Sequence, residues 1–135
     1  TGVQTCALPI FFEYIEKVLN SNAIVNEHVG NRIFFYQVEE TDEESINLPF
    51  IVINSLDPYS PRSFASNNYF NQNFVVQIDV ESKEDSITKL VANEITKELF
   101  KHYLFKLDGG LDEFFIETQR FVDSRRYEGI PKNIN

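Results

Sequence analysis

The side chains that could carry acid–base or metal chemistry at neutral pH are few and widely spaced. His28 and His102 are the only histidines, and Cys6 is the only cysteine. Two separated histidines do not give the ligand spacing of a zinc site, and the acidic residues 39–47 lack the Asp-x-Asp-x-Asp-Gly spacing of a calcium loop. Gly109-Gly110 lacks the further glycines and the Lys-Ser/Thr of a phosphate-binding loop. The sequence therefore predicts no catalytic, cofactor-binding or metal-binding residue, and a protein that is not an enzyme.

A second chemical pattern lies in residues 57–73, where aromatic side chains are mixed with an arginine and several amides. Tyrosine, phenylalanine and arginine are enriched where protein interfaces exclude water, so these side chains are candidates for contact with a partner. The alternative is that two or three of them fold back onto the core. The interface candidates of this stretch are Tyr59, Arg62, Phe64, Tyr69 and Phe70.

Two further charged clusters stand out. Residues 39–47 contain five acids and most simply form a solvated surface: Glu39, Glu40, Asp42, Glu43 and Glu44. Near the C-terminus, Arg125, Arg126 and Tyr127 are further candidates for contact with a partner, and they lie on a predicted strand, where neighbouring side chains point to opposite faces. One arginine can then pair with an acid inside the subunit and the other can face a partner, or both can be solvated.

Hydrophobic spacing predicts the elements that hold these residues. Apolar positions recur every three or four residues in the helices and every second residue in the clearest strand. Ser82 and Asp85 resemble a capping box before the longer helix. The predicted helices cover residues 11–19 and 87–103, with a further turn at 23–29, and the predicted strands cover 33–38, 50–56, 74–81, 114–119 and 120–127.

This order predicts an α+β fold, in which a largely antiparallel or mixed sheet of four to five strands is packed by two helices. Residues 11–130 are predicted to form one domain and residues 131–135 a short C-terminal tail. The 42% hydrophobic content of this 135-residue chain is sufficient for a core without disulfides or metal.

Net charge and hydropathy argue against a nucleic-acid-binding protein and against a membrane protein. The chain carries 12 Lys+Arg against 21 Asp+Glu, a formal charge of −9, and its longest basic run is the pair Arg125-Arg126. A nucleic-acid-binding domain needs a basic surface, so specific binding of DNA or RNA is not expected. No apolar run approaches the length of a membrane span, and no secretory signal is visible, so we expect a soluble intracellular protein.

The first ten residues, TGVQTCALPI, contain no charge, whereas the rest of the chain holds all of its charged side chains. This string resembles the translation of a widely used sequencing-adapter oligonucleotide. The resemblance implies that residues 1–10 are a non-native segment in place of the natural N-terminus, the alternative being a natural N-terminal peptide. Without Cys6 the natural chain would contain no cysteine, which fits a reducing compartment.

Four segments in this order carry a resemblance to a known family: PFIVI at residues 49–53, VQIDV at 76–80, the long helix, and DSRRYEG at 123–129. Together they resemble small tail-component proteins of long-tailed phages and prophages of Gram-positive bacteria, long catalogued as a domain of unknown function. That family is similar in size and element order to phage tail terminators. Glu128 departs from its pattern, because family members often have a basic or small residue before the final glycine.

The resemblance implies a structural role in the virion tail, with assembly in the bacterial host cytoplasm. The chain would form a homo-oligomeric ring, a hexamer, that caps the tail tube and contacts both the major tail tube protein and the neck or connector proteins. DNA would pass through this ring without specific binding, and the acids of residues 39–44 are hypothesised to line the lumen, where like charge repels DNA. No cofactor and no membrane are implied.

Two alternatives remain open from the sequence. A head-closure or connector protein of the neck differs from a terminator only in which ring it contacts. A small hydrolase or a regulatory binding domain is the alternative from another class, since an enzyme can use Asp and Glu outside any recognisable motif.

Overall fold

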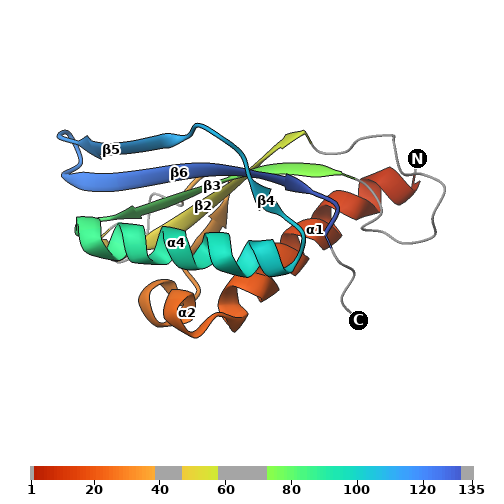
Figure 1. Ribbon diagram of the computed structural model, residues 1–135, viewed down its shortest axis with the longest axis horizontal. Coiled ribbons are helices and arrows are strands. Elements are labelled where there is room, and N and C mark those ends of the chain that lie inside the picture. Colours follow the sequence, from red (N-terminus) through yellow and green to blue (C-terminus); the bar gives the residue numbers. More distant parts are fainter. Residues whose placement is uncertain (1, 39–46, 58–72, 132–135) are drawn as a thin grey trace.

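The computed structural model describes residues 2–38, 47–57 and 73–131, which form helices and one mixed sheet (Figure 1). The helices and strands of these residues are α1 (Gly2–Ser21), α2 (Ala23–Val29), β1 (Ile33–Phe35), β2 (Phe50–Asp57), β3 (Phe74–Ser82), α4 (Asp85–Lys101), β4 (Phe105–Lys106), β5 (Leu111–Phe115) and β6 (Arg120–Gly129). The predicted α+β class with a mixed sheet is confirmed. The sheet has six strands rather than four or five, and three helices pack on it rather than two.

The strand order is β1-β2-β3-β6-β4, with β5 also paired to β6. Only β1 and β2 run parallel, and the other pairs are antiparallel. β3 pairs with the whole length of β6, from Phe74 opposite Gly129 to Ser82 opposite Phe121. Because that side of β6 is occupied, β4 and β5 must follow one another along its other side, where they form an interrupted edge strand.

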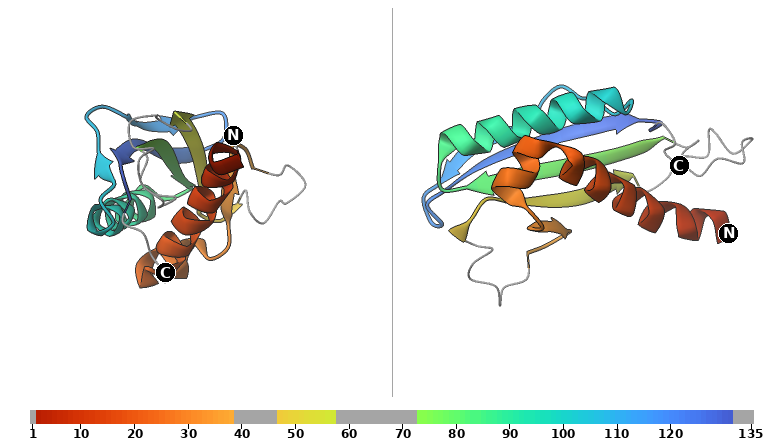
Figure 2. Two further views of the ribbon diagram at one scale, coloured as in Figure 1. Left: turned by 90° about the vertical axis from the view of Figure 1, so that its right-hand side faces the viewer. Right: turned by 90° about the horizontal axis from the view of Figure 1, so that it is seen from below.

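All three helices lie on the same side of the sheet, and no described helix covers the opposite face (Figures 1 and 2). α4 runs along the sheet near β6, and α1 crosses it obliquely. β3 confirms the predicted alternation, since Phe74, Val76, Ile78 and Val80 are buried while the residues between them are half-buried. The helix-covered face therefore forms the core and the other face remains available for polar groups.

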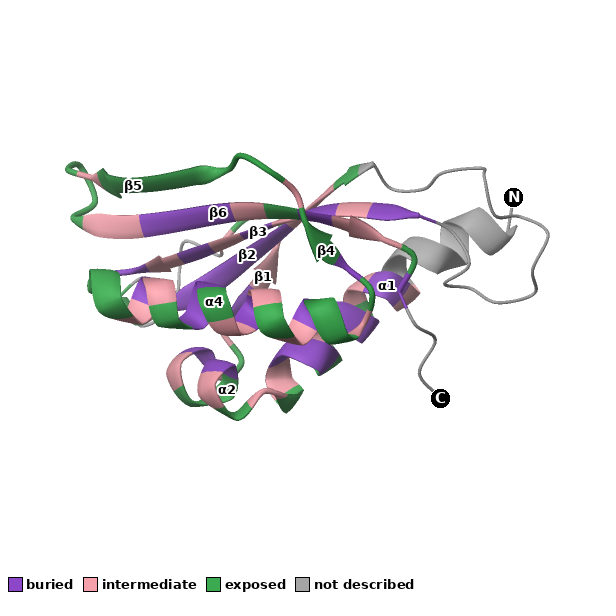
Figure 3. Cartoon of the chain, viewed as in Figure 1, coloured by how far each residue is buried: buried purple, intermediate pink, exposed green. Residues whose placement is uncertain are grey.

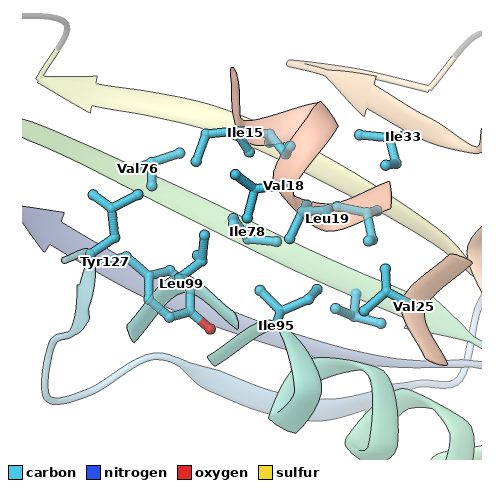
Figure 4. Packing of buried hydrophobic residues seen from close by; sticks show 14 of the residues in the cluster. Ile15, Val18, Leu19, Val25, Ile33, Val76, Ile78, Ile95, Leu99 and Tyr127 are labelled. Atoms are coloured by element: carbon cyan, nitrogen blue, oxygen red, sulfur yellow. The ribbon is translucent and has the colours of Figure 1, made fainter. Parts of the chain in front are cut away.

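The core lies between this face and the apolar sides of the helices (Figures 3 and 4). Phe11 of α1 stacks on Phe74 of β3, with ring centroids 3.9 Å apart and both side chains fully buried. Burial raises the pKa of the Tyr14 hydroxyl to about 12, so this side chain stays neutral in the core. α1 begins at Gly2 and thus includes residues 2–10, but its helical backbone does not test their origin, which stays a prediction.

The start of α4 differs from the predicted capping box. The N-cap residue is Glu84, whose side chain makes no capping hydrogen bond. Ser82 instead accepts a hydrogen bond from the Glu84 backbone N–H at 3.1 Å and contacts the Thr88 hydroxyl at 2.6 Å. The predicted capping box was wrong because Ser82 still belongs to β3, two residues before the N-cap Glu84, so Asp85 is the first and not the third helical residue.

The final hairpin is also displaced from its prediction. The strand predicted at residues 114–119 is β5, Leu111–Phe115, and residues 116–119 form the turn into β6. Gln119 has a φ of 59°, which a tight turn requires and a strand does not tolerate. The hydrophobic run from Phe114 to Ile116 concealed this turn, and β4 was missed because two residues are too short for any periodic pattern.

Two adjacent glycines between β4 and β5 provide a matched test of how closely this connection packs against β6. Gly110 has a φ of 114°, and a Cβ there would collide with the backbone carbonyl oxygen of Ser124. Gly109 has a φ of 90° but open space around it. We expect Gly110→Ala to lower the free energy of unfolding by about 3 kcal/mol and Gly109→Ala by only about 1 kcal/mol, measured by urea denaturation. Equal losses would show that Gly110 is not tightly packed against β6.

Candidate interaction surfaces

A charged network joins α4 to the C-terminal strands, with Asp123 of β6 at its centre. Asp123 is only 3% exposed. Arg125, two residues further along the same strand face, donates hydrogen bonds from Nε and Nη2 to the two oxygens of Asp123 at 2.8 and 3.2 Å. Lys89 of α4 donates to Asp123 Oδ2 at 3.1 Å. One buried carboxylate therefore pairs with two cations from different elements.

Lys89 extends this network to the edge of the sheet. Its ammonium group also contacts Asp112 of β5 and lies 3.9 Å from Asp85. Burial acts to lower the pKa of Lys89, but its hydrogen bonds and charge attraction with Asp112 and Asp123 outweigh that effect and raise the pKa. Lys89 thus stays charged at neutral pH and ties β5 and β6 to α4.

On the other side of Asp123, the network continues through Thr96 into the core. Arg125 donates to Thr96 Oγ1 at 3.0 Å, and Thr96 shares a hydrogen bond of 2.8 Å with the Tyr127 hydroxyl. Burial raises the pKa of Tyr127. Tyr127 is 1% exposed, so its interpretation as a surface interface residue is wrong for the folded chain. Arg125 therefore pairs with an acid of the same chain. This is the first of the two arrangements that the sequence left open, rather than the one in which both arginines are solvated.

Arg126 points to the opposite, open face of the sheet, because successive side chains alternate along β6. Its Nε donates to Gln77 Oε1 at 3.2 Å, and Gln77 Nε2 donates to Asp79 at 3.1 Å. Ser124 donates to the same Asp79 oxygen at 2.6 Å. Four polar side chains from β3 and β6 therefore form a connected row across the open face.

Next to this row the open face is hollowed. A depression of about 360 Å³ lies between β3 and the β5–β6 hairpin, with Glu81 and Leu111 among its lining residues. Burial raises the pKa of Glu81, although Arg120, whose Nε is 3.8 Å away, acts to lower it. Because the raised pKa means that folding favours the protonated form, the contribution of Glu81 to stability falls as the pH rises through its folded pKa.

Most of the exposed apolar side chains in the described part of the chain come from one stretch of the sequence. Seven of the eleven large exposed hydrophobic residues in the described part of the chain fall between positions 90 and 116, on α4, β4, β5 and the following turn. They are Leu90, Phe100, Tyr103, Phe105, Leu111, Phe114 and Ile116. Figure 3 shows β5 exposed along its length. Such a concentration is typical of a surface that contacts another protein.

Most sequence-predicted interface residues cannot be placed. Tyr59, Arg62, Phe64, Tyr69 and Phe70 lie outside the described residues, as do the lumen candidates Glu39, Glu40, Asp42, Glu43 and Glu44. Of the remaining three, Arg126 is exposed, Arg125 is mostly buried and Tyr127 is in the core.

The sequence analysis missed Lys89 and Asp123 as a pair. Asp123 and Arg125 are two residues apart on a predicted strand, which places them on one face, and that spacing could have indicated an ion pair. The contact with Lys89 depends on tertiary packing and has no local signal.

Within residues 2–38, 47–57 and 73–131, no group of three or more His, Cys, Asp or Glu side chains could hold a metal ion. Over the same residues, the helices lack the length and apolar character needed to cross a membrane.

The geometry defines an α+β protein whose sheet has one helix-covered face, an opposite face that carries a row of polar side chains, and an edge strand, β5, with exposed apolar side chains. No known family model and no curated protein matches this chain. A chain in the solved structure titled "Virion of native gene transfer agent (GTA) particle" is similar in fold, with a TM-score of 0.58 and 9% sequence identity. The alignment covers 88% of this chain and 92% of that chain. At this identity the similarity establishes a shared fold.

Proposed function

We propose that the chain is a structural subunit of a phage-like virion, and that within the virion it is a tail terminator. The observation that carries the proposal is the fold shared with a chain of a gene transfer agent virion, because the alignment covers nearly all of both chains. The resemblance to small phage tail proteins also supports this proposal, and it rests on sequence segments rather than on the fold.

The surfaces of the molecule fit an assembly role. A ring subunit needs a rigid sheet, and here a charged network fixes the last strands to α4. It also needs surfaces that adhere to neighbouring subunits, and the exposed apolar side chains between positions 90 and 116 offer one. Nothing in this role requires catalysis, a cofactor or a membrane.

In the proposed ring, copies of the chain form a hexamer on the last ring of the tail tube protein and present their other side to the neck. The net charge of −9 suits a channel through which DNA slides without being held. The acids of residues 39–44 remain candidates for its lumen, and the aromatic residues 59–70 remain candidates for contact with the tube or a neighbouring subunit. The ring would be assembled in the host cytoplasm and remain in the virion tail.

Binding to isolated virion parts separates a terminator from a connector protein of the neck. We expect the purified chain to co-sediment with purified tail tubes that lack it, and not with purified heads, because a terminator recognises the tube end. An unrelated protein of similar size and charge serves as the control for trapping. Binding to heads alone would favour the connector role, and binding to neither part would contradict the proposed place in the tail.

A further inference from the structure

The outer edge of β5 is an unpaired strand edge among the described residues. β5 pairs with β6 on one side, and no other strand among the described residues pairs with its opposite side. Leu111 and Phe114, which point to opposite faces of the sheet, are 42% and 44% exposed, and Ile116 in the next turn is 70% exposed. Edge strands are commonly protected by charged side chains or proline, and β5 carries two acids but no lysine or proline. We call Leu111, Glu113, Phe114, Ile116 and Glu117 the β5 edge surface.

The negative charges of the β5 edge oppose pairing between the β5 strands of two copies of the chain. Residues 107–119 contain four acids, Asp108, Asp112, Glu113 and Glu117, and no lysine or arginine. Two β5 strands side by side would bring carboxylates together, and like charges opposite one another are destabilising. The edge therefore suits an apolar partner segment that is free of acids and carries a positive charge.

One stretch of this chain has that composition. Residues 58–78 form its longest acid-free stretch, although the chain contains 21 acids. Within it, residues 58–72 carry a single charge, Arg62, and four aromatic side chains. Residues 58–72 lie outside the described structure, and their composition complements the β5 edge surface in both charge and apolar character.

The positions of the flanking residues favour contact between two copies. Residues 58–72 connect Asp57 at the end of β2 to Asn73 before β3, where Phe74 pairs with Gly129. The β5 edge surface lies near the other end of the sheet, since Glu113 pairs with Val122, which pairs with Glu81 (Figure 1). Val122 and Gly129 are seven residues apart along β6, a separation of about 23 Å. The residues that flank residues 58–72 thus lie at the opposite end of the sheet from the β5 edge surface, an arrangement that suits a head-to-tail ring contact.

We propose that the β5 edge surface is a docking site for residues 58–72 of a second copy of the chain. This inference rests on the proposed ring and names its subunit contact. Each copy gives residues 58–72 to one neighbour and receives those of the other on β5. Such a heterologous contact repeats around the ring until it closes.

Photo-crosslinking tests the contact directly. A photoreactive phenylalanine analogue replaces Phe114, and this protein is mixed with an equal amount of ¹⁵N-labelled chain that lacks the analogue. We expect crosslinks from position 114 to residues 58–72 of the labelled copy, identified by mass spectrometry. Crosslinks to residues 58–72 of the same copy only, crosslinks to other segments, or the absence of mixed products at every protein concentration would overturn the proposal.

Charge reversal provides an independent readout. Arg62→Glu alone, or Glu113→Lys with Glu117→Lys, is expected to raise the dissociation constant of self-association about tenfold, because each change brings like charges together. The combined triple variant restores opposite charges and is expected to return within about threefold of the original chain. Glu27→Lys, an equally exposed charge reversal on α2, is the control and is expected to leave association unchanged.

Failure of this contact can be told apart from failure of the proposed function. If the chain forms rings that bind tail tubes but position 114 crosslinks elsewhere, only the β5 docking site is wrong. If the triple variant associates no better than Arg62→Glu or the double variant Glu113→Lys with Glu117→Lys, while all of them still bind tubes, the charge pairing is likewise wrong. A chain that forms no oligomer and binds no tube would overturn both.

Discussion

Replacing Asp123 by alanine is expected to lower the free energy of unfolding by about 3 kcal/mol, because it leaves Arg125 and Lys89 together without the carboxylate that separates them. The side chain of Asp123 is 4% exposed, that of Arg125 is 17% and that of Lys89 is 30% exposed. Water can therefore solvate the two cations only in part. The loss should appear as a lower urea midpoint with an unchanged slope.

Two variants control this prediction. Asp108→Ala removes a carboxylate at an exposed position and is expected to change stability by no more than about 0.5 kcal/mol. Asp123→Asn keeps the shape and one acceptor oxygen but removes the charge. Its loss in the free energy of unfolding is therefore expected to lie between those of Asp108→Ala and Asp123→Ala. If Asp123→Ala were no more destabilising than Asp108→Ala, the network would not hold β6 to α4.

The parts of the fold that were predicted correctly have strong local patterns. The residues of α4 repeat their apolar positions every three or four residues, and those of β3 alternate strictly, so each element shows its buried side without knowledge of the rest. The position of β5 depends instead on its pairing with β6 and on a tight turn at Gln119. β4 consists of two residues and exists only because β6 is long enough to pair with it.

The candidate site was predicted less well, and Arg125 shows why. Alternation along β6 predicted that Arg125 and Arg126 face opposite sides, which is confirmed, but it could not show which side the helices cover. An arginine on the covered side is stable only because Asp123 and Thr96 accept its hydrogen bonds. Thr96 is 29 residues away in the sequence, so this compensation has no local signal.

The surface that the structure adds is the apolar edge at β5. The strand predicted at residues 114–119 includes Phe114, Ile116 and Glu117 but not Leu111 or Glu113, and the sequence could not show that this strand lies at an edge of the sheet. Strand order sets that exposure, because β6 is covered by β3 on one side and by β4 and β5 on the other. The edge and residues 58–72 together supply the two complementary surfaces that a head-to-tail ring needs.

The proposed function predicts that deletion of the gene for this chain abolishes plaque formation. A terminator stops the growth of the tail tube, so without it tubes should continue to polymerise and fail to join heads. Expression of the chain from a plasmid should restore both tail length and infectivity. The Asp108→Ala variant, which is expected to fold normally, should restore them equally well.

Negative-stain electron microscopy of the deletion lysate is the most direct test of the central claim. The proposed function predicts full heads beside unattached tails that are longer than normal and variable in length. Unattached tails of normal length would show that the chain is a connector protein of the neck instead. Intact particles with normal tails and normal infectivity would contradict a structural role in the virion.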